Sequence, residues 1–173
     1  QTLLRLHRHR EHAEIPPETK TPDALRAAYS PKAGEPVPEV CWMIERICAP
    51  GAPLHWARLQ ESPVRLSEDA VRVLYLGDSA HGMVPTLGQG ATQAIEGSCT
   101  AATEIARLHA GGCRDSRIWI DAVKAARAER VSFVMDFSRE ASDTILAGAD
   151  PVKGTRKKNG PEFLGKLRRL YND

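Results

Sequence analysis

The sequence contains no apolar run that approaches the roughly 20 residues needed to cross a membrane. It also has no short apolar segment behind a basic start that would resemble a signal peptide. Its 24 Lys plus Arg stand against 22 Asp plus Glu, and a net charge of +2 is too small and too mixed to indicate a nucleic-acid or membrane surface. These absences favour a cytoplasmic protein with neither a nucleic acid nor a membrane as its partner.

Paired metal or disulfide ligands are missing as well. A chain of 173 residues can bury a core without disulfides, and no C-x-x-C pair occurs among its four cysteines. We therefore expect reduced thiols in the core at Cys41, Cys48, Cys99 and Cys113. His7 and His9 would share one face of a strand, but no cysteine or second histidine pair stands at ligand spacing. No metal site is predicted.

The chain begins without a helix cap or turn signal. Residue 1 is Gln rather than Met, and residues 1–12 are typical of the middle of an element. We interpret Leu3–His12 as a strand that leaves a core and becomes exposed to solvent. The chain is therefore expected to be a piece of a longer protein.

Proline is concentrated between Ile15 and Pro63, which excludes long regular elements there. Thr21 as N-cap and Pro22 at the first helical position predict a short helix to about Tyr29. A second short helix is predicted from Pro38 to about Ile47. The two tryptophans of this region are expected to be packed, with the lining of a pocket as the alternative: Trp42 and Trp56.

A strand, a glycine-containing loop and a helix follow as one unit. Residues 71–76, Val-Arg-Val-Leu-Tyr-Leu, predict a strand buried on both faces. The loop Gly77–Gly90 comes next, and apolar residues at helical spacing then predict a helix from Ala91 to Leu108, ended by Gly111-Gly112. A second long helix is predicted from Asp115 or Ser116 to about Leu146.

The last segment is basic. Residues 153–169 contain seven Lys or Arg and a single acid, Glu162. We expect a solvated basic tail; the alternative is a short helix docked through Leu164, Leu167 and Leu170.

The loop after the strand carries residue types that suit a nucleotide-like ligand. Asp78 stands at the carboxyl end of a buried strand, where open α/β sheets bind ligands, and a carboxylate there suits a pair of sugar hydroxyls. Gly88 and Gly90 flank the start of the next helix, so backbone N–H groups can approach a flat ligand. Such donors stabilise an atom that gains negative charge, as a reduced flavin does around N1 and O2.

These residues resemble a known motif. Gly77-Asp78-Ser79-Ala80-His81, followed by Pro85 and Gly88-Gln89-Gly90, is similar to the second FAD-binding motif of single-component flavoprotein aromatic hydroxylases. This is the group of p-hydroxybenzoate and salicylate hydroxylases. The resemblance extends from Val71 to Leu108, with looser similarity through Arg139.

The resemblance implies a role for each residue of the loop. Asp78 would hydrogen-bond the ribityl chain of FAD, and backbone groups of Ala91 and Thr92 would meet the pyrimidine edge of the flavin. The residues placed beside the isoalloxazine ring would be Pro85, Gly88, Gln89 and Gly90. No catalytic residue is assigned, and His81 is expected to order the loop.

The implied parent protein is a monooxygenase that uses NAD(P)H and O2 to hydroxylate an aromatic or similarly electron-rich small molecule. Its N-terminal G-x-G-x-x-G half is absent here. The expected fold class is therefore α/β: a partial, Rossmann-like FAD-binding domain with a strand, long helices and the tail of a substrate-domain sheet. The expected segments are the end of the substrate domain (1–66), the second half of the FAD domain (67–148) and the C-terminal segment (149–173).

Two other functions remain open. A strand followed by Gly77-Asp78-Ser79-Ala80-His81 is close to the G-x-S-x-G elbow of a serine hydrolase, with Ser79 as nucleophile, but the last position is not glycine. The second alternative is a non-catalytic flavin-binding or interaction fragment. Because half of the FAD site would lie outside this chain, we expect the isolated chain to be inactive and to need the N-terminal half of the same protein.

Overall fold

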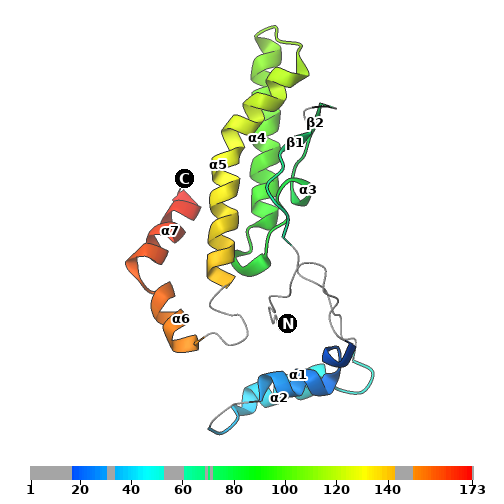
Figure 1. Ribbon diagram of the computed structural model, residues 1–173, viewed down its shortest axis with the longest axis vertical. Helices are drawn as coiled ribbons and strands as arrows, with labels where there is room; N and C mark the ends of the chain where they lie inside the picture. Colours follow the sequence, from blue (N-terminus) through cyan, green and yellow to red (C-terminus); the bar gives the residue numbers. More distant parts are fainter. Residues whose placement is uncertain are drawn as a thin grey trace. The chain divides into compact units, whose positions relative to one another are not determined.

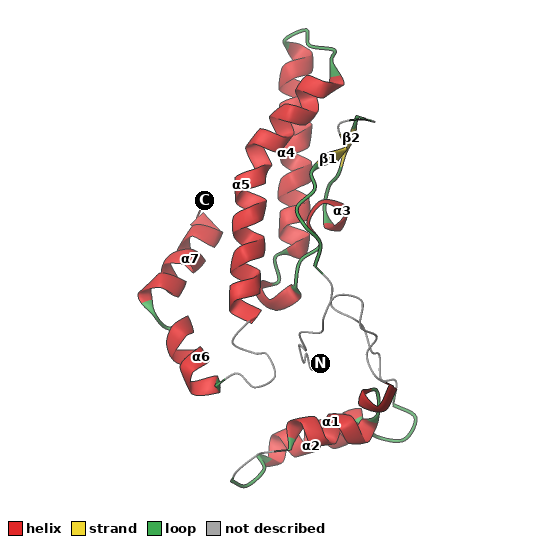
Figure 2. Ribbon diagram, viewed as in Figure 1, coloured by secondary structure: helices red, strands yellow, loops and turns green. Residues whose placement is uncertain are grey.

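The computed structural model describes residues 17–30, 34–52, 61–68, 70, 72–142 and 150–172. These residues fall into two compact units, 17–52 and 61–172, which are described separately below. The structure is mostly helical and includes one small sheet (Figures 1 and 2). A mixed α/β chain is thus confirmed, whereas the FAD-binding identity of its domain stays a prediction. The predicted strand Leu3–His12 and Trp56 lie outside the described residues.

The first unit contains a 3-10 turn η1 (Pro17–Thr19) and two helices, α1 (Pro22–Tyr29) and α2 (Pro38–Ile47). Both predicted helices are confirmed at their predicted bounds. The Thr21 hydroxyl accepts a hydrogen bond from the Ala24 N–H at 3.1 Å, as its N-cap role requires. Trp42, however, is 64% exposed, so the prediction that it is packed is wrong.

The sheet of the second unit is smaller than the sequence predicts. Strand β1 (Ser67–Glu68) pairs in antiparallel register with β2 (Val73–Leu74). Val73 and Leu76 are each 38% exposed, so the expectation of a strand buried on both faces is wrong within the described chain. A continuous apolar run is buried on both faces only where other strands and helices cover both. In the described residues β1 is the only strand paired with this run, while Tyr75 and Leu76 line a small cavity together with Gly97 and Val123.

Two long helices form the body of this unit. After the one-turn helix α3 (Asp78–His81) and the 3-10 turn η2 (Pro85–Leu87), helix α4 (Gly90–Ala110) runs to the turn at Gly111-Gly112. Helix α5 (Ser116–Ser142) returns beside it (Figure 1). Both helices confirm the sequence prediction, with residues 143–149 outside the described part.

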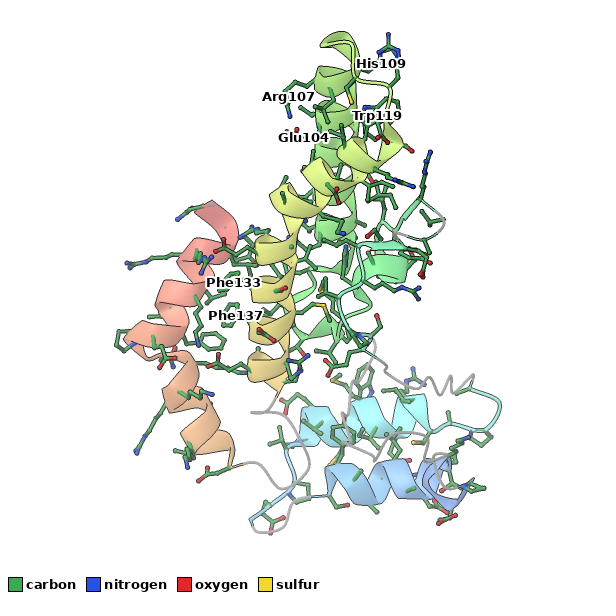
Figure 3. All side chains as sticks on the ribbon, turned by 45° about the horizontal axis from the view of Figure 1, so that its top comes forward. Glu104, Arg107, His109, Trp119, Phe133 and Phe137 are labelled. Carbon is green, nitrogen blue, oxygen red and sulfur yellow. The ribbon has the colours of Figure 1, made fainter. Side chains whose placement is uncertain are left out.

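The C-terminal segment forms helices α6 (Pro151–Lys158) and α7 (Pro161–Asn172). Phe163 and Leu170 of α7 are buried against α5, where Phe163 meets Phe137 with ring centroids 4.8 Å apart. Figure 3 shows Phe133 and Phe137 on the side of α5 that faces α7. The expectation of a solvated tail is therefore wrong for α7, because its apolar face is covered by a helix distant in sequence.

The cysteines only partly follow the prediction. All four are free, but only Cys48 is buried, whereas Cys41 and Cys99 are exposed and Cys113 is half-buried. Sequence composition does not say which side of a helix each thiol occupies, and Cys41 and Cys99 lie on the solvent side.

Candidate functional site

The turn after β2 is built around a glycine. Gly77 has φ +59°, a conformation that L side chains rarely adopt, and a Cβ there would stand 3.4 Å from the Ala94 Cβ of α4. Its carbonyl accepts hydrogen bonds from the N–H groups of Ala80, at 2.9 Å, and His81, at 3.0 Å. The glycine thus starts α3 and places Asp78 as its first residue.

The carboxylate of Asp78 lies beside the beginning of α4. Asp78 is exposed, and its Oδ1 is 3.9 Å from the position that a Cβ on Gly90 would occupy. No hydrogen-bond donor within the described ranges binds this carboxylate. The structure therefore brings together two of the residues that the sequence prediction assigned to one ligand, and leaves the carboxylate available to an external donor.

Gly88 closes the loop in the left-handed conformation. Its φ is +64°, its N–H donates to the Pro85 carbonyl at 3.0 Å, and a Cβ there would meet nothing within 4 Å. The backbone at this position thus borders open space. A flat ligand can approach it without displacing protein atoms.

The first turn of α4 presents unpaired donors. The backbone N–H groups of Gly90, Ala91 and Thr92 make no hydrogen bond to described residues, and no side chain caps the helix at Gln89. The turn itself contains no acidic residue, and the carboxylate of Asp78 is the negative group that lies beside it. Gln89 itself is buried, and its carbonyl accepts the Gln93 N–H at 2.8 Å. The Gln89 side chain therefore packs in the protein, while the three residues after it offer donors.

The loop is supported from three sides. Thr86 Oγ1 and Ser142 Oγ lie 2.5 Å apart and connect η2 to the end of α5. Met83 and Leu87 pack against the apolar cluster of α5 and α7. Ser62 binds Gly82 twice, through its N–H to the glycine carbonyl at 2.9 Å and through its Oγ, which accepts the glycine N–H at 3.1 Å. Sequence reasoning missed Ser62 and Ser142, since neither belongs to a motif.

The remaining candidates of the loop do not form a catalytic group. His81 is only 2% exposed and its Nδ1 is buried without a partner, so it lies in the interior of the turn. Ser79 Oγ donates to the Leu76 carbonyl at 2.7 Å. In the part of the chain that the structure describes, Ser79 has no histidine partner, so the geometry offers no support for the hydrolase alternative.

The interior beside the loop has little free space. A cavity of about 10 Å³ is lined by residues of the turn and of α5, among them His81 and Arg127. It has room for roughly one water molecule. Asp78, Gly88, Ala91 and Thr92, by contrast, are exposed.

Two other kinds of site were sought among the described residues. No group of three or more His, Cys, Asp or Glu is arranged to hold a metal ion in those ranges, which exclude His7 and His9. The described helices also include none with the length and apolar character to cross a membrane.

Comparison with known proteins gives three relatives. The chain is 37% identical over 116 residues to the FAD-dependent monooxygenase dmxR9 of Cryptosporiopsis sp. (strain 8999), covering 62% of this chain and 22% of the relative. It is 33% identical over 137 residues to the FAD-dependent monooxygenase mdpD of Emericella nidulans, covering 76% of this chain and 26% of the relative. It is 36% identical over 78 residues to the Notoamide E oxidase notB' of Aspergillus versicolor, covering 45% of this chain and 16% of the relative.

These homologues support a relationship to FAD-dependent monooxygenases. The chain spans about a quarter or less of the length of the relatives it matches. No family model matches the sequence, and no solved structure matches it.

Proposed function

We propose that this chain contributes the ribityl and flavin-ring part of the FAD site of a monooxygenase. The homologues support the FAD dependence and the oxidoreductase class. The observation that carries the proposal is the placement of Asp78 beside Gly90, with an accessible carboxylate on one side and unpaired N–H groups on the other. A polyol accepts hydrogen bonds and donates them, so both kinds of group suit it.

Each site residue has a proposed task. Asp78 accepts hydrogen bonds from hydroxyls of the ribityl chain. Pro85, Gly88 and Gly90 provide a backbone surface beside the isoalloxazine ring. Gln89 belongs to the same surface through its backbone, while its side chain is buried and anchors the segment. The N–H groups of Ala91 and Thr92 point to the pyrimidine edge and, with the helix dipole, favour negative charge there.

FAD, when bound, supplies the redox chemistry by which O2 is activated to hydroxylate a substrate. The proposed reductant is NAD(P)H, and the proposed substrate is an aromatic or similarly electron-rich small molecule. The protein's own contribution is to bind the cofactor, orient it and stabilise negative charge at one edge of the ring. We propose that the pyrophosphate contacts come from another part of the same natural protein, since the relatives are about four times longer than the matched region.

The proposed site is tested in the natural protein that contains this chain. Asp78→Ala is expected to weaken FAD binding by about 1.5–3 kcal/mol, the scale of a hydrogen bond to a charged group. Titration of the apoprotein with FAD, followed by flavin fluorescence, measures this change. Unchanged affinity would contradict the assignment of Asp78.

A second variant separates the fold from the ligand surface. Asparagine tolerates the left-handed conformation of Gly88, so Gly88→Asn should remain folded. Its side chain would enter the open space in which the ring is proposed to lie, and FAD affinity should fall. Gly112→Asn is the matched control, because Gly112 also has a positive φ, +88°, and open surroundings, but follows the far end of α4.

The alternative of a non-catalytic flavin-binding or interaction fragment remains a proposal of its own. The small share of the relatives that the chain covers favours testing it. Purified alone, the chain should show no stoichiometric yellow flavin and no turnover if the site needs a further half. Tight stoichiometric FAD in the isolated chain would contradict that requirement.

A further inference from the structure

Arg127 is a buried cation on α5 whose hydrogen-bond acceptors lie on α4. Its side chain is 7% exposed, so its charge requires partners inside the protein. Nη1 donates to Glu96 Oε2 at 2.8 Å, and Nη2 donates to Gln93 Oε1 at 2.7 Å and to the Gln93 carbonyl at 3.4 Å. The planar guanidinium therefore connects Gln93 and Glu96, which lie three positions apart on α4. A lysine ammonium does not reproduce this geometry.

Gln93 connects Arg127 to the donors of the proposed flavin site. It is fully buried, and its N–H donates to the Gln89 carbonyl at 2.8 Å, which makes it the residue that closes the first turn of α4. The three unpaired N–H groups, at Gly90, Ala91 and Thr92, lie within that turn. The hydrogen bond from Arg127 to Gln93 therefore restrains the turn of α4 that contains these N–H groups.

Arg127 also borders the turn that carries Asp78. It lines the small cavity together with Gly77, Ala80 and His81. Gly97 of α4 lies beside the guanidinium, and a Cβ there would make an ordinary contact with Arg127 Nε at 3.9 Å. One side chain therefore contacts α4 and faces the Gly77–His81 turn, the two elements that supply the proposed flavin contacts.

The carboxylate of Glu96 pairs with two arginines of α5. Its Oε2 lies 2.8 Å from Arg127 Nη1 and 3.6 Å from Arg130 Nε. Burial raises the pKa of Glu96, but the hydrogen bond and charge of Arg127 and the nearby Arg130 outweigh it, so that the pKa of Glu96 is lowered overall. Glu96 is therefore ionised at neutral pH and is a charged hydrogen-bond partner of Arg127.

We propose that Arg127 is a positioning residue, which fixes the separation between Asp78 and the N–H groups of Gly90, Ala91 and Thr92. The inference rests on the proposed function and deepens it. Loss of the bridge lets the first turn of α4 move relative to α3, so the donors no longer point at one edge of the ring.

The test compares Arg127→Lys with Arg107→Lys. Arg107 is a residue of α4 whose exposed side chain binds only Glu104, one turn earlier in the same helix. It lies toward the C-terminal end of α4, away from the first turn (Figure 3). Both variants keep the positive charge. Hydrogen–deuterium exchange is measured on the purified chain, which requires no cofactor, for the backbone amides of residues 93–97, which begin with the first hydrogen-bonded amide of α4.

Exchange in residues 93–97 should become about tenfold faster in Arg127→Lys, because loss of buried hydrogen bonds of the guanidinium lowers the free energy of local opening, and should stay unchanged in Arg107→Lys. In the natural protein that contains this chain, Arg127→Lys should bind FAD more weakly and shift the midpoint potential of the flavin to more negative values. Faster exchange without a change in affinity or potential would show a merely structural role and overturn the proposal. Unchanged exchange would overturn it as well.

If Arg127→Lys fails to fold, Gln93→Met provides a second test. It preserves the side-chain volume and the Arg127–Glu96 pair, and it removes the Oε1 acceptor of Arg127 Nη2. It should move exchange, affinity and potential in the same directions, and no change in these would overturn the inference. A wild-type natural protein that binds no FAD would instead overturn the proposed function, a result distinct from an unaltered variant of a flavin-binding protein.

Discussion

The hydroxyls of Thr86 and Ser142 lie 2.5 Å apart and join residues that are 56 positions apart in the sequence. Thr86 belongs to η2 in the candidate flavin loop, and Ser142 is the last residue of α5. Ser142 Oγ donates its one hydrogen to the Ser138 carbonyl at 2.8 Å, so Thr86 Oγ1 is the donor in its contact with Ser142 Oγ. The loop is thereby fixed to the longest helix of the described chain.

Thr86→Val removes this link while preserving shape. We expect a loss of about 1 kcal/mol in the free energy of unfolding, the usual net value of a hydrogen bond, measured by urea denaturation. Thr100→Val is the control, because the Thr100 hydroxyl binds only the Glu96 carbonyl one turn earlier in its own helix, at 2.8 Å. Equal effects of the two substitutions would contradict a special role for the Thr86–Ser142 contact.

Substitution by alanine should affect FAD affinity at one glycine of α4, Gly90, and not at another, Gly97. At Gly97 a Cβ makes ordinary contacts, at 3.9 Å from Arg127 Nε and 4.0 Å from Leu76 Cδ2. Gly97→Ala should therefore stabilise the protein by about 0.5–1 kcal/mol through helix propensity and leave FAD affinity unchanged. Gly90→Ala should also fold, but its methyl group would stand 3.9 Å from Asp78 Oδ1, within the proposed site.

We expect Gly90→Ala to reduce FAD affinity in the natural protein that contains this chain, and Gly97→Ala to retain it. Thermal denaturation measures the stability of both variants, and fluorescence titration measures the affinity. An affinity loss shared by both variants would point to a general effect of stiffening α4 rather than to the location of the ligand.

Glu140 makes the docking of the C-terminal helices dependent on pH. Its carboxylate binds Lys166 of α7 at 2.6 Å and Lys157 of α6 at 3.2 Å. The hydrogen bond from Lys166 lowers the pKa of Glu140, and with the contribution of Lys157 it outweighs the opposite effect of burial, so the pKa lies below its ordinary value of 4.5. A lowered folded-state pKa means that the stabilisation is complete above about pH 4.5 and is lost as pH falls through the folded-state value.

Glu140→Gln should therefore lower stability at pH 7 by about 0.5–1 kcal/mol, the scale of a partly exposed ion pair. The difference from wild type should disappear in acid, once Glu140 of the wild type is protonated. Denaturation curves at pH 7 and at a series of lower pH values measure the difference and the pH at which it is lost. A difference that stays the same down to the lowest pH at which the protein folds would exclude an ionic origin.

Phe163 is the main apolar anchor of α7. It is 6% exposed and contacts Phe137 in a tilted arrangement. Phe163→Ala should cost up to about 3–5 kcal/mol, the range for buried aromatic residues, or the free energy of docking α7 where that is smaller. Hydrogen exchange should accelerate in residues 161–172 first. Tyr171→Ala, at an exposed position of the same helix, should change neither quantity.

Local signals explain which elements could be predicted. The Thr21 cap with Pro22 set the start of α1, and Gly111-Gly112 set the end of α4, because each acts within one or two turns of the chain. The strand predicted over residues 71–76 is observed only at Val73–Leu74 and is less buried than predicted, since burial depends on neighbours that a periodicity does not contain. The predictions that Trp42 and Cys41 are buried are wrong for the same reason.

The candidate site divides along the same line. Its motif residues from Asp78 to Thr92 are contiguous and could be selected from the sequence, and the structure places Asp78 next to Gly90. Arg127, Ser62 and Ser142 could not be selected, because they contact the loop across 20 to 56 residues of sequence and carry no motif. The assignment of the motif residues to FAD remains a prediction.

The apolar cluster in which Phe163 and Leu170 of α7 pack against α5 also contacts Met83 and Leu87 of the candidate loop. Helix α7 and the loop therefore share one set of packing partners. Removal of α7 is expected to loosen the loop as well, so shortened versions that stop after α5 should be assayed for loop order before any negative result with flavin is interpreted.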